Sequence, residues 1–213
     1  MKRAASQSPI RKKTIYRLSI YLGCLQRLNE NGIRTVSSET LAQVAGVKSA
    51  QLRKDLTYFG QFGTRGLGYN VPRLCERIAL NLGTNRLQPV VLVGVGNLGS
   101  ALLAYKGFEK EGFEIVGAFD VDIRRKRSKD FSQPIRPLAR LAGCIKKHNV
   151  RMGIITVPAT AAQSVANALI EAGVTAILNF APTILHVAEE IMVNNVNLAS
   201  ELENLSYFVQ TEH

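Results

Sequence analysis

The sequence contains few of the residues that build disulfide frameworks and metal sites. It has no tryptophan, three cysteines and three histidines among 213 residues. Cys24, Cys75 and Cys144 form no C-x-x-C pair, and the histidines lack ligand spacing. This pattern predicts a reducing cytosol and no metal site. No stretch approaches the roughly 20 unbroken apolar residues of a membrane helix, and the basic start leads into no apolar signal region. We therefore expect a cytoplasmic protein that is neither secreted nor membrane-spanning.

Acidic residues are scarce in the first two-fifths of the chain. Residues 1–86 hold 15 Lys and Arg but only four acids, whereas residues 87–213 hold 12 of each sign. This segregation predicts two modules, the first of which binds a polyanion. A basic surface that only aids solubility is the alternative. The boundary is predicted at residues 83–89, which are rich in turn formers and end in a helix-stopping proline.

The basic module shows the pattern of a helix-turn-helix. Ile15, Leu18, Leu22, Leu25 and Leu28 form an apolar stripe at helical period, which predicts a first helix between Pro9 and Asn31-Gly32. A hydroxyl cap at residues 37–38 begins a short helix that ends at Gly46. Ser49 is predicted to cap a further helix over residues 50–59. Two short helices joined by residues 45–48 are typical of a DNA-reading module.

The second short helix is predicted to read the DNA. It would bury Leu52, Leu56 and Phe59 and turn its polar side chains outward, toward phosphates and base edges. Four glycines between residues 60 and 68 surround one arginine, which predicts a wing able to enter a minor groove. The predicted DNA contacts are Ser49, Gln51, Arg53, Lys54, Tyr58 and Arg65. A small helical domain with an ordinary glycine loop is the alternative.

The neutral module carries a dinucleotide-binding pattern. The β-branched run over residues 89–93 predicts a buried parallel strand, followed by Gly94-Val95-Gly96-Asn97-Leu98-Gly99 and a helix over residues 100–105. Glycines in this pattern allow a tight turn, the approach of a pyrophosphate, and close packing of helix on strand. The amino end of that helix offers free N–H groups to phosphates.

The next strand ends at an acid suited to a ribose. Residues 114–119 predict this strand, and Asp120 follows it 21 residues after Gly99. A carboxylate there binds the ribose hydroxyls and repels a 2′-phosphate, which favours NAD over NADP. The basic run over residues 124–127 keeps NADP open, although such runs are more often solvated loops.

Two further strand ends complete the predicted site. Strands over residues 152–157 and 174–178 alternate with helices over residues 138–145 and 161–172, and ligands in such sheets bind beyond the carboxyl ends of the strands. The candidates to line the nicotinamide half are Thr156, Pro158, Asn179, Phe180 and Pro182.

The last residues predict an amphipathic helix. Leu198, Leu202, Leu205 and Val209 lie on one helical face. This face packs either on the chain's own sheet or on a partner subunit, and a protein that reads palindromic DNA needs a dimer.

The sequence resembles the Rex family of redox-sensing bacterial transcriptional repressors from about residue 10 to residue 209. The matching segments are residues 37–38, 51–60, 62–69, 94–99, 105, 119–122, 156–158 and 179–182. The resemblance implies an α/β chain: an N-terminal winged helix-turn-helix (1–86), a Rossmann domain that binds NAD(H) (87–196), and a C-terminal helix exchanged between the subunits of a homodimer (197–213).

The resemblance also implies a function without catalysis. Rex repressors bind operator DNA and leave it when NADH binds, and Tyr105 matches a family residue near the nicotinamide. An Arg on the first helix and an Asp before the last helix form a charged latch in the family, whereas this chain has Gly23 and Asn197 there. We therefore expect a Rex-type repressor with a weakened or altered NADH response. A small NAD-dependent dehydrogenase and a CoA- or nucleotide-binding module remain as alternatives, although neither explains residues 1–86.

Overall fold

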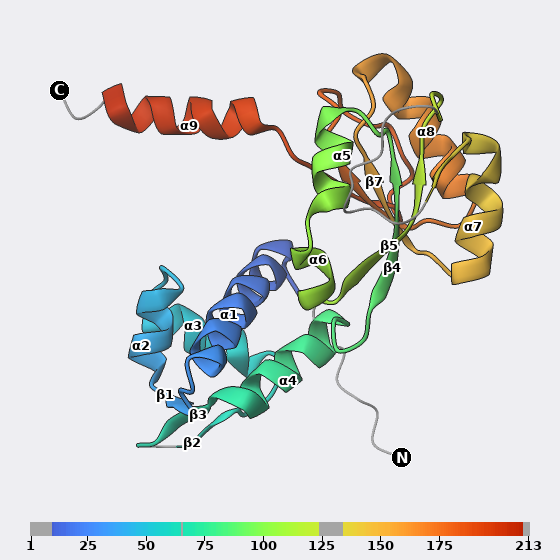
Figure 1. Ribbon diagram of the computed structural model, residues 1–213. Coiled ribbons are helices and arrows are strands. Elements are labelled where there is room, and N and C mark those ends of the chain that lie inside the picture. Colours follow the sequence, from blue (N-terminus) through green and yellow to red (C-terminus); the bar gives the residue numbers. More distant parts are fainter. Residues whose placement is uncertain (1–9, 65, 124–133, 211–213) are drawn as a thin grey trace. The chain divides into compact units, whose positions relative to one another are not determined.

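A computed structural model describes residues 10–64, 66–123 and 134–210. Two compact units follow one another along the chain (Figure 1): the first extends to Arg86 and the second begins at Leu87. No helix among the described residues is long and apolar enough to cross a membrane.

In its described residues, the first unit combines four helices with a small antiparallel sheet. Its elements are α1 (Lys12–Glu30), β1 (Thr35–Val36), α2 (Ser38–Val44), α3 (Ser49–Thr57), β2 (Gly63–Thr64), β3 (Gly68–Asn70) and α4 (Val71–Leu82). The strand order is β1-β3-β2. Helices α2 and α3 and the β2–β3 hairpin lie where the helix-turn-helix and the wing were predicted, whereas β1 and α4 were not predicted.

The core of the first unit is built around α1. Leu18, Tyr21 and Leu25 are fully buried and pack with residues of α3 and α4. Ile15 lies outside this core with 38% of its surface exposed. The predicted stripe therefore begins one turn later than expected, because Tyr21 rather than Ile15 completes the buried face.

The caps of the short helices agree only in part with the prediction. Ser37 caps α2 as expected, since its Oγ accepts a hydrogen bond of 3.0 Å from the backbone N–H of Thr40. Ser49 does not cap α3: the N-cap is Lys48, whose backbone is extended and whose side chain makes no capping bond. Ser49 is already helical, so the predicted cap is wrong by one position.

The end of α4 also differs from the expectation. Gly83, with a φ of +76°, ends this helix in the left-handed conformation that glycine adopts without strain. Pro89 does not stop a helix; it lies in β4 opposite Glu114.

The second unit is a six-stranded parallel sheet flanked by helices. Its elements are β4 (Gln88–Val93), α5 (Asn97–Ala104), α6 (Gly107–Lys110), β5 (Phe113–Phe119), β6 (Ile135–Arg136), a 3-10 turn (Leu138–Arg140), α7 (Leu141–His148), β7 (Met152–Ile155), α8 (Ala159–Glu171), β8 (Ala176–Asn179), β9 (Met192–Asn195) and α9 (Leu198–Gln210). The strand order is β6-β5-β4-β7-β8-β9. The chain runs outward from β4 in both directions, so the topological switch point lies between β4 and β7.

The two faces of the sheet are covered unequally. Helices α7 and α8 pack on one face, where Phe119, Ile155 and Leu169 belong to the largest buried cluster (Figure 1). The other face has a smaller cluster around Leu92 and Leu103, to which α5 contributes. The apolar side chains of α9 are more than 60% exposed in the single chain, so the first alternative, packing on the chain's own sheet, does not describe this helix.

Candidate DNA-binding and nucleotide-binding sites

Three of the predicted DNA-contacting side chains lie on the outer surface of α3 or just after it. Arg53 and Lys54 are exposed, and half of the surface of Tyr58 is accessible. Leu52 and Leu56 on the opposite side of α3 are buried, which fixes the rotation of the helix about its own axis. The exposed side therefore presents two cations and a phenol.

Gln51 does not point outward as predicted. Its side chain is half-buried, and its Nε2 donates a hydrogen bond of 2.8 Å to Oδ1 of Asp55, one turn later. The prediction gave no role to Asp55, the residue that accepts this hydrogen bond. Asp55 is only 1% exposed.

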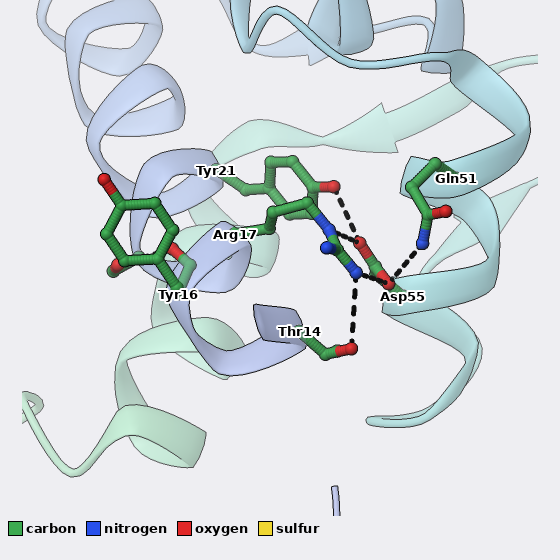
Figure 2. A network of polar contacts seen from close by, with 7 residues as sticks. Thr14, Tyr16, Arg17, Tyr21, Gln51 and Asp55 are labelled. Atoms are coloured by element: carbon green, nitrogen blue, oxygen red, sulfur yellow. Dashed lines mark hydrogen bonds and ion pairs between the residues drawn. The ribbon is translucent and has the colours of Figure 1, made fainter. Parts of the chain in front are cut away.

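Asp55 is the centre of a polar network that joins α1 to α3. Figure 2 shows Arg17 and Tyr21 of α1 directed at the same carboxylate as Gln51. Arg17 donates from Nε to Oδ2 (2.6 Å) and from Nη2 to Oδ1 (2.8 Å), and the Tyr21 hydroxyl donates to Oδ2 (2.8 Å). Arg17 Nη2 also reaches the hydroxyl of Thr14 at 3.3 Å. The bonds from Arg17 and Tyr21 to Asp55 connect residues 38 and 34 positions apart, and they hold α1 and α3 together.

The network fixes the charge state of its members. Burial opposes ionisation of Asp55, but hydrogen bonds from Arg17, Tyr21 and Gln51 outweigh it and hold the pKa of this carboxyl below its ordinary value. Burial, together with the hydrogen bond to Asp55, raises the pKa of Tyr21. Asp55 is therefore an anion at neutral pH, and Tyr21 is its neutral donor.

A second polar cluster lies at the surface between α2 and α3. Nη1 of Arg53 donates to Oγ of Ser38 (2.9 Å) and to Oε1 of Glu39 (3.1 Å). Ser38 also donates to Glu39, at 3.0 Å. The cluster borders a concave notch of about 470 Å³. The notch is lined by Ser37, Ser38, Glu39, Arg53, Gly63, Gly66, Leu67, Gly68 and Tyr69.

The wing is held close to the start of α2. Gly68 has a φ of +80°, and a side chain there would overlap the carbonyl oxygen of Val36. Only glycine fits this approach. Arg65, the predicted minor-groove residue at the tip of the hairpin, lies outside the described residues.

The glycine loop of the second unit is tightly packed beneath its helix. Gly94 has a φ of +100°, and an added Cβ would come within 2.7 Å of the carbonyl carbon and oxygen of Thr156. A Cβ on Gly99 would overlap the carbonyl oxygen of Gly94. The tight turn and the close packing of α5 on it are possible because neither position carries a side chain. Gly96, Asn97 and Leu98 at the amino end of α5 are partly or fully exposed, and the first N–H groups of a helix lack intrahelical partners.

Thr156 supports this loop from the neighbouring strand. Its Oγ1 donates to the carbonyl oxygens of Gly94 (2.6 Å) and Val93 (3.2 Å). The hydroxyl therefore holds the shape of the loop, and a place of Thr156 at the nicotinamide stays a prediction.

Asp120 lies at the end of β5, beside the glycine loop. Its Oδ2 accepts the backbone N–H of Val95 at 2.5 Å, and its Oδ1 accepts that of Asp122 at 2.9 Å. The basic run over residues 124–127, which kept NADP open, lies outside the described residues.

The register of the sheet brings the other predicted residues to the same edge. Val93, Ile155 and Asn179 are aligned across β4, β7 and β8. Asn179 is fully buried, and its Nδ2 donates to the Thr183 carbonyl (2.9 Å) and to Oδ1 of Asn195 (2.8 Å). Its side chain therefore shapes the loop after β8. Pro158 and Pro182 are exposed, and Phe180 is half-buried.

Tyr105 follows α5 and packs edge to face against Phe108, with ring centroids 5.1 Å apart. Slightly more than half of its surface is exposed. Phe108 also borders an apolar pocket of about 260 Å³ on the less covered face of the sheet. Side chains from β4, β5, β7, β8 and β9 line the rest of this pocket, which the sequence did not reveal.

Among the described residues, no group of three or more His, Cys, Asp or Glu could hold a metal ion.

Known proteins resemble the chain over nearly its whole length. Residues 10–57 match the family described as "Putative DNA-binding protein N-terminus", and residues 85–183 match "CoA binding domain". A "Redox-sensing transcriptional repressor Rex" of Pelotomaculum thermopropionicum is 50% identical over 200 residues, covering 93% of this chain and 94% of the relative. The chain belongs to the Rex family. A Rex protein of Carboxydothermus hydrogenoformans is 48% identical and covers 95% of this chain and 98% of the relative.

Solved Rex structures share this fold. RSP, a Rex-family repressor, in complex with beta-NAD⁺ and operator DNA is 33% identical, with a TM-score of 0.86 over 97% of this chain and 95% of that one. RSP in complex with beta-NADH has a TM-score of 0.84 and covers 97% of each chain at 32% identity. The predicted α/β architecture of this Rex-family chain is confirmed. Its relatives carry the name of repressors and not of enzymes.

Proposed function

We propose that this protein is a cytoplasmic, homodimeric transcriptional repressor that binds operator DNA and leaves it when NADH binds. The observation behind this proposal is that one chain of the Rex family combines the cationic surface of α3 with a glycine-rich loop at the amino end of α5.

The first unit supplies the DNA contacts. Arg53, Lys54 and Tyr58 reach outward from α3 and its end, so they contact base edges and phosphates, and Arg65 at the wing reaches the minor groove. Ser49, the first residue of α3, offers its hydroxyl and N–H to a phosphate. Gln51 contacts DNA only if its bond to Asp55 opens.

The second unit supplies the nucleotide site. The residues proposed to hold NAD(H) are Gly94, Val95, Gly96, Asn97, Leu98, Gly99, Tyr105, Asp120, Thr156, Pro158, Asn179, Phe180 and Pro182. The N–H groups at the start of α5 bind the pyrophosphate, and Asp120 accepts the ribose hydroxyls, which favours NAD(H) over its 2′-phosphorylated form. Thr156 and Asn179 act by holding the two strand-end loops in place.

The bound nucleotide reports the redox state of the cell, because its oxidised ring carries a positive charge and its reduced ring does not. The aromatic pair Tyr105 and Phe108 and the half-buried Phe180 offer no carboxylate to that charge. Burial of an unpaired charge is costly, so this environment favours the reduced form. A ligand shifts a conformational equilibrium only by its differential affinity for the two states.

Helix α9 is proposed to join two chains. It exposes Leu198, Leu202, Leu205, Phe208 and Val209, whereas a sheet face of the same unit has an open apolar pocket. Exchange of α9 between two copies covers the helix, gives a two-fold dimer and matches the symmetry of a palindromic operator. Deletion of residues 198–213 should convert the dimer into monomers in sedimentation experiments.

The latch positions distinguish this chain from the family pattern. Asn197 caps α9, since its Oδ1 accepts the N–H groups of Ala199 (3.0 Å) and Ser200 (3.3 Å), but it carries no charge. Gly23 offers no side chain at all. A switch without both latch charges responds to NADH weakly or through other contacts.

The deciding experiment is operator binding at one fixed salt concentration, titrated separately with NADH, NAD⁺ and CoA. Salt is fixed because phosphate contacts make the affinity depend steeply on ionic strength. Release by NADH alone supports the proposal. Release by CoA alone supports the CoA-binding alternative, which the match of residues 85–183 keeps open. Steady NADH turnover with a carbonyl substrate would instead support a dehydrogenase.

A further inference from the structure

The Arg53 guanidinium is held from one side only. It has five N–H groups, and the two on Nη1 are directed at Ser38 and Glu39. In the described part of the chain, Nε and Nη2 have no hydrogen-bond partner. This free edge is the one that binds a guanine or a phosphate through two parallel hydrogen bonds.

The two acceptors belong to a well-fixed part of the fold. Ser38 and Glu39 form the first turn of α2, which Ser37 caps. They lie 15 and 14 residues before Arg53, so their contacts span the turn between the two helices. The side chain of Ser38 is itself bonded to Glu39, which closes a triangle of three polar groups.

The charge of Glu39 is secure at neutral pH. Hydrogen bonds from its own backbone N–H and from Ser38 lower the pKa of this exposed carboxyl, and Arg53 lowers it further. An anion on a surface that meets phosphates repels DNA of any sequence, because the repulsion does not depend on the bases. Its presence beside Arg53 therefore opposes unspecific binding while it orients the arginine.

We propose that Glu39, with Ser38, is a positioning residue for operator specificity: it holds Arg53 through Nη1 so that the Nε–Nη2 edge faces the DNA. This inference rests on the proposed function. A free arginine loses more side-chain entropy on binding than one held in place beforehand. Glu39 therefore strengthens binding to the operator and weakens binding to other sequences.

The test compares two duplexes of equal length at one salt concentration. One carries an operator selected by the protein from a random library, and the other is its scrambled form. For Glu39→Ala we expect weaker operator binding and equal or tighter binding to the scrambled duplex. The ratio of the two Kd values should fall by about tenfold. Glu39→Gln keeps a neutral acceptor and should retain most of the operator affinity.

Two controls separate positioning from charge and from folding. Glu76→Ala removes an exposed acid of α4 in the same unit and should leave the ratio unchanged. In an Arg53→Ala background, Glu39→Ala should no longer alter the ratio. Thermal unfolding of each variant, monitored by circular dichroism, identifies any loss of fold.

If Glu39→Ala shifts the Kd values for both duplexes by the same factor, the proposed role of Glu39 is wrong. It is also wrong if Glu76→Ala changes the ratio of the two Kd values as much as Glu39→Ala does. A wild-type protein that does not distinguish the two duplexes would contradict the proposed DNA-reading function itself.

Discussion

Arg17 binds both carboxylate oxygens of Asp55, at 2.6 Å and 2.8 Å, across 38 residues of sequence. The carboxylate is 1% exposed, whereas 23% of the arginine side chain remains accessible. The pair connects α1 with the helix that carries Arg53 and Lys54. The buried side of α3 is thereby tied to α1.

Asp55→Asn should destabilise the first unit. Removal of one partner from a buried ion pair costs about 3–5 kcal/mol, and we expect about 2–3 kcal/mol here because Arg17 keeps contact with water. Urea unfolding of the full chain, with separate probes in the two units, measures the effect. Glu30→Gln, at the exposed end of α1, is the matched control and should change little. Equal stabilities of Asp55→Asn and wild type would show that the pair contributes nothing.

The same carboxyl predicts a dependence of stability on pH. The pKa of Asp55 is lower in the folded protein than in the unfolded chain, so the folded state binds fewer protons. Its contribution is complete above the unfolded value of about 4 and is lost as the pH falls through the lower folded value. Acid unfolding of wild type should therefore be steeper below pH 4 than that of Asp55→Asn. Identical slopes for the two proteins would contradict this assignment.

Lys54→Ala should weaken operator binding without affecting the fold. Its ammonium group is exposed, and the loss of one base contact costs about 1–3 kcal/mol with relaxed specificity at one position. If Lys54 contacts a phosphate, its loss should instead weaken binding to all DNA sequences alike. The slope of log affinity against log salt concentration should then fall by about one. Anisotropy titrations at several salt concentrations distinguish these two results. Unchanged binding would remove Lys54 from the interface.

Gly99→Ala should abolish nucleotide binding. The new methyl group overlaps the carbonyl oxygen of Gly94, so helix α5 must move away from the loop that receives the pyrophosphate. Calorimetric titration with NADH measures the loss, and retained DNA binding shows that the first unit is intact. Gly143→Ala is a suitable control, because a Cβ at Gly143 meets no atom within 4 Å. Wild-type NADH affinity in Gly99→Ala would contradict the proposed site.

Gly23→Arg combined with Asn197→Asp should sharpen the NADH response. A Cβ at Gly23 meets no atom within 4 Å, and aspartate caps a helix as well as asparagine does, so both changes are compatible with the fold. Operator release is followed as NADH is added to wild type, both single variants and the double variant. The prediction requires the double variant to release the operator at a lower NADH concentration than either single variant does.

Helices and strands that depend on neighbouring residues could be predicted from the sequence. The β-branched run before Gly94 predicted β4, and the hydroxyl at Ser37 predicted the start of α2. Helix α4 was missed although its signals are also local: Asn70 caps it, Pro72 occupies its first turn and Gly83 ends it.

Contacts between distant segments could not be read from the sequence. Asp55 was given no role from the sequence, because nothing near it reveals Arg17 or Tyr21 of α1. Thr156 and Asn179 were placed correctly at strand ends, but their side chains bond to the protein. The acceptors of Thr156 and the Asn195 acceptor of Asn179 lie on neighbouring strands or their ends, which only the parallel register brings close.

The exposed apolar side chains of α9 also carry a genetic consequence. If each subunit gives its last helix to the other, chains synthesised together assort into mixed dimers. A chain with weakened DNA binding, such as Lys54→Ala, would then pair with wild-type chains and lower the operator occupancy of the mixed dimers. Such an allele should be dominant, and removal of α9 from the same chain should make it recessive.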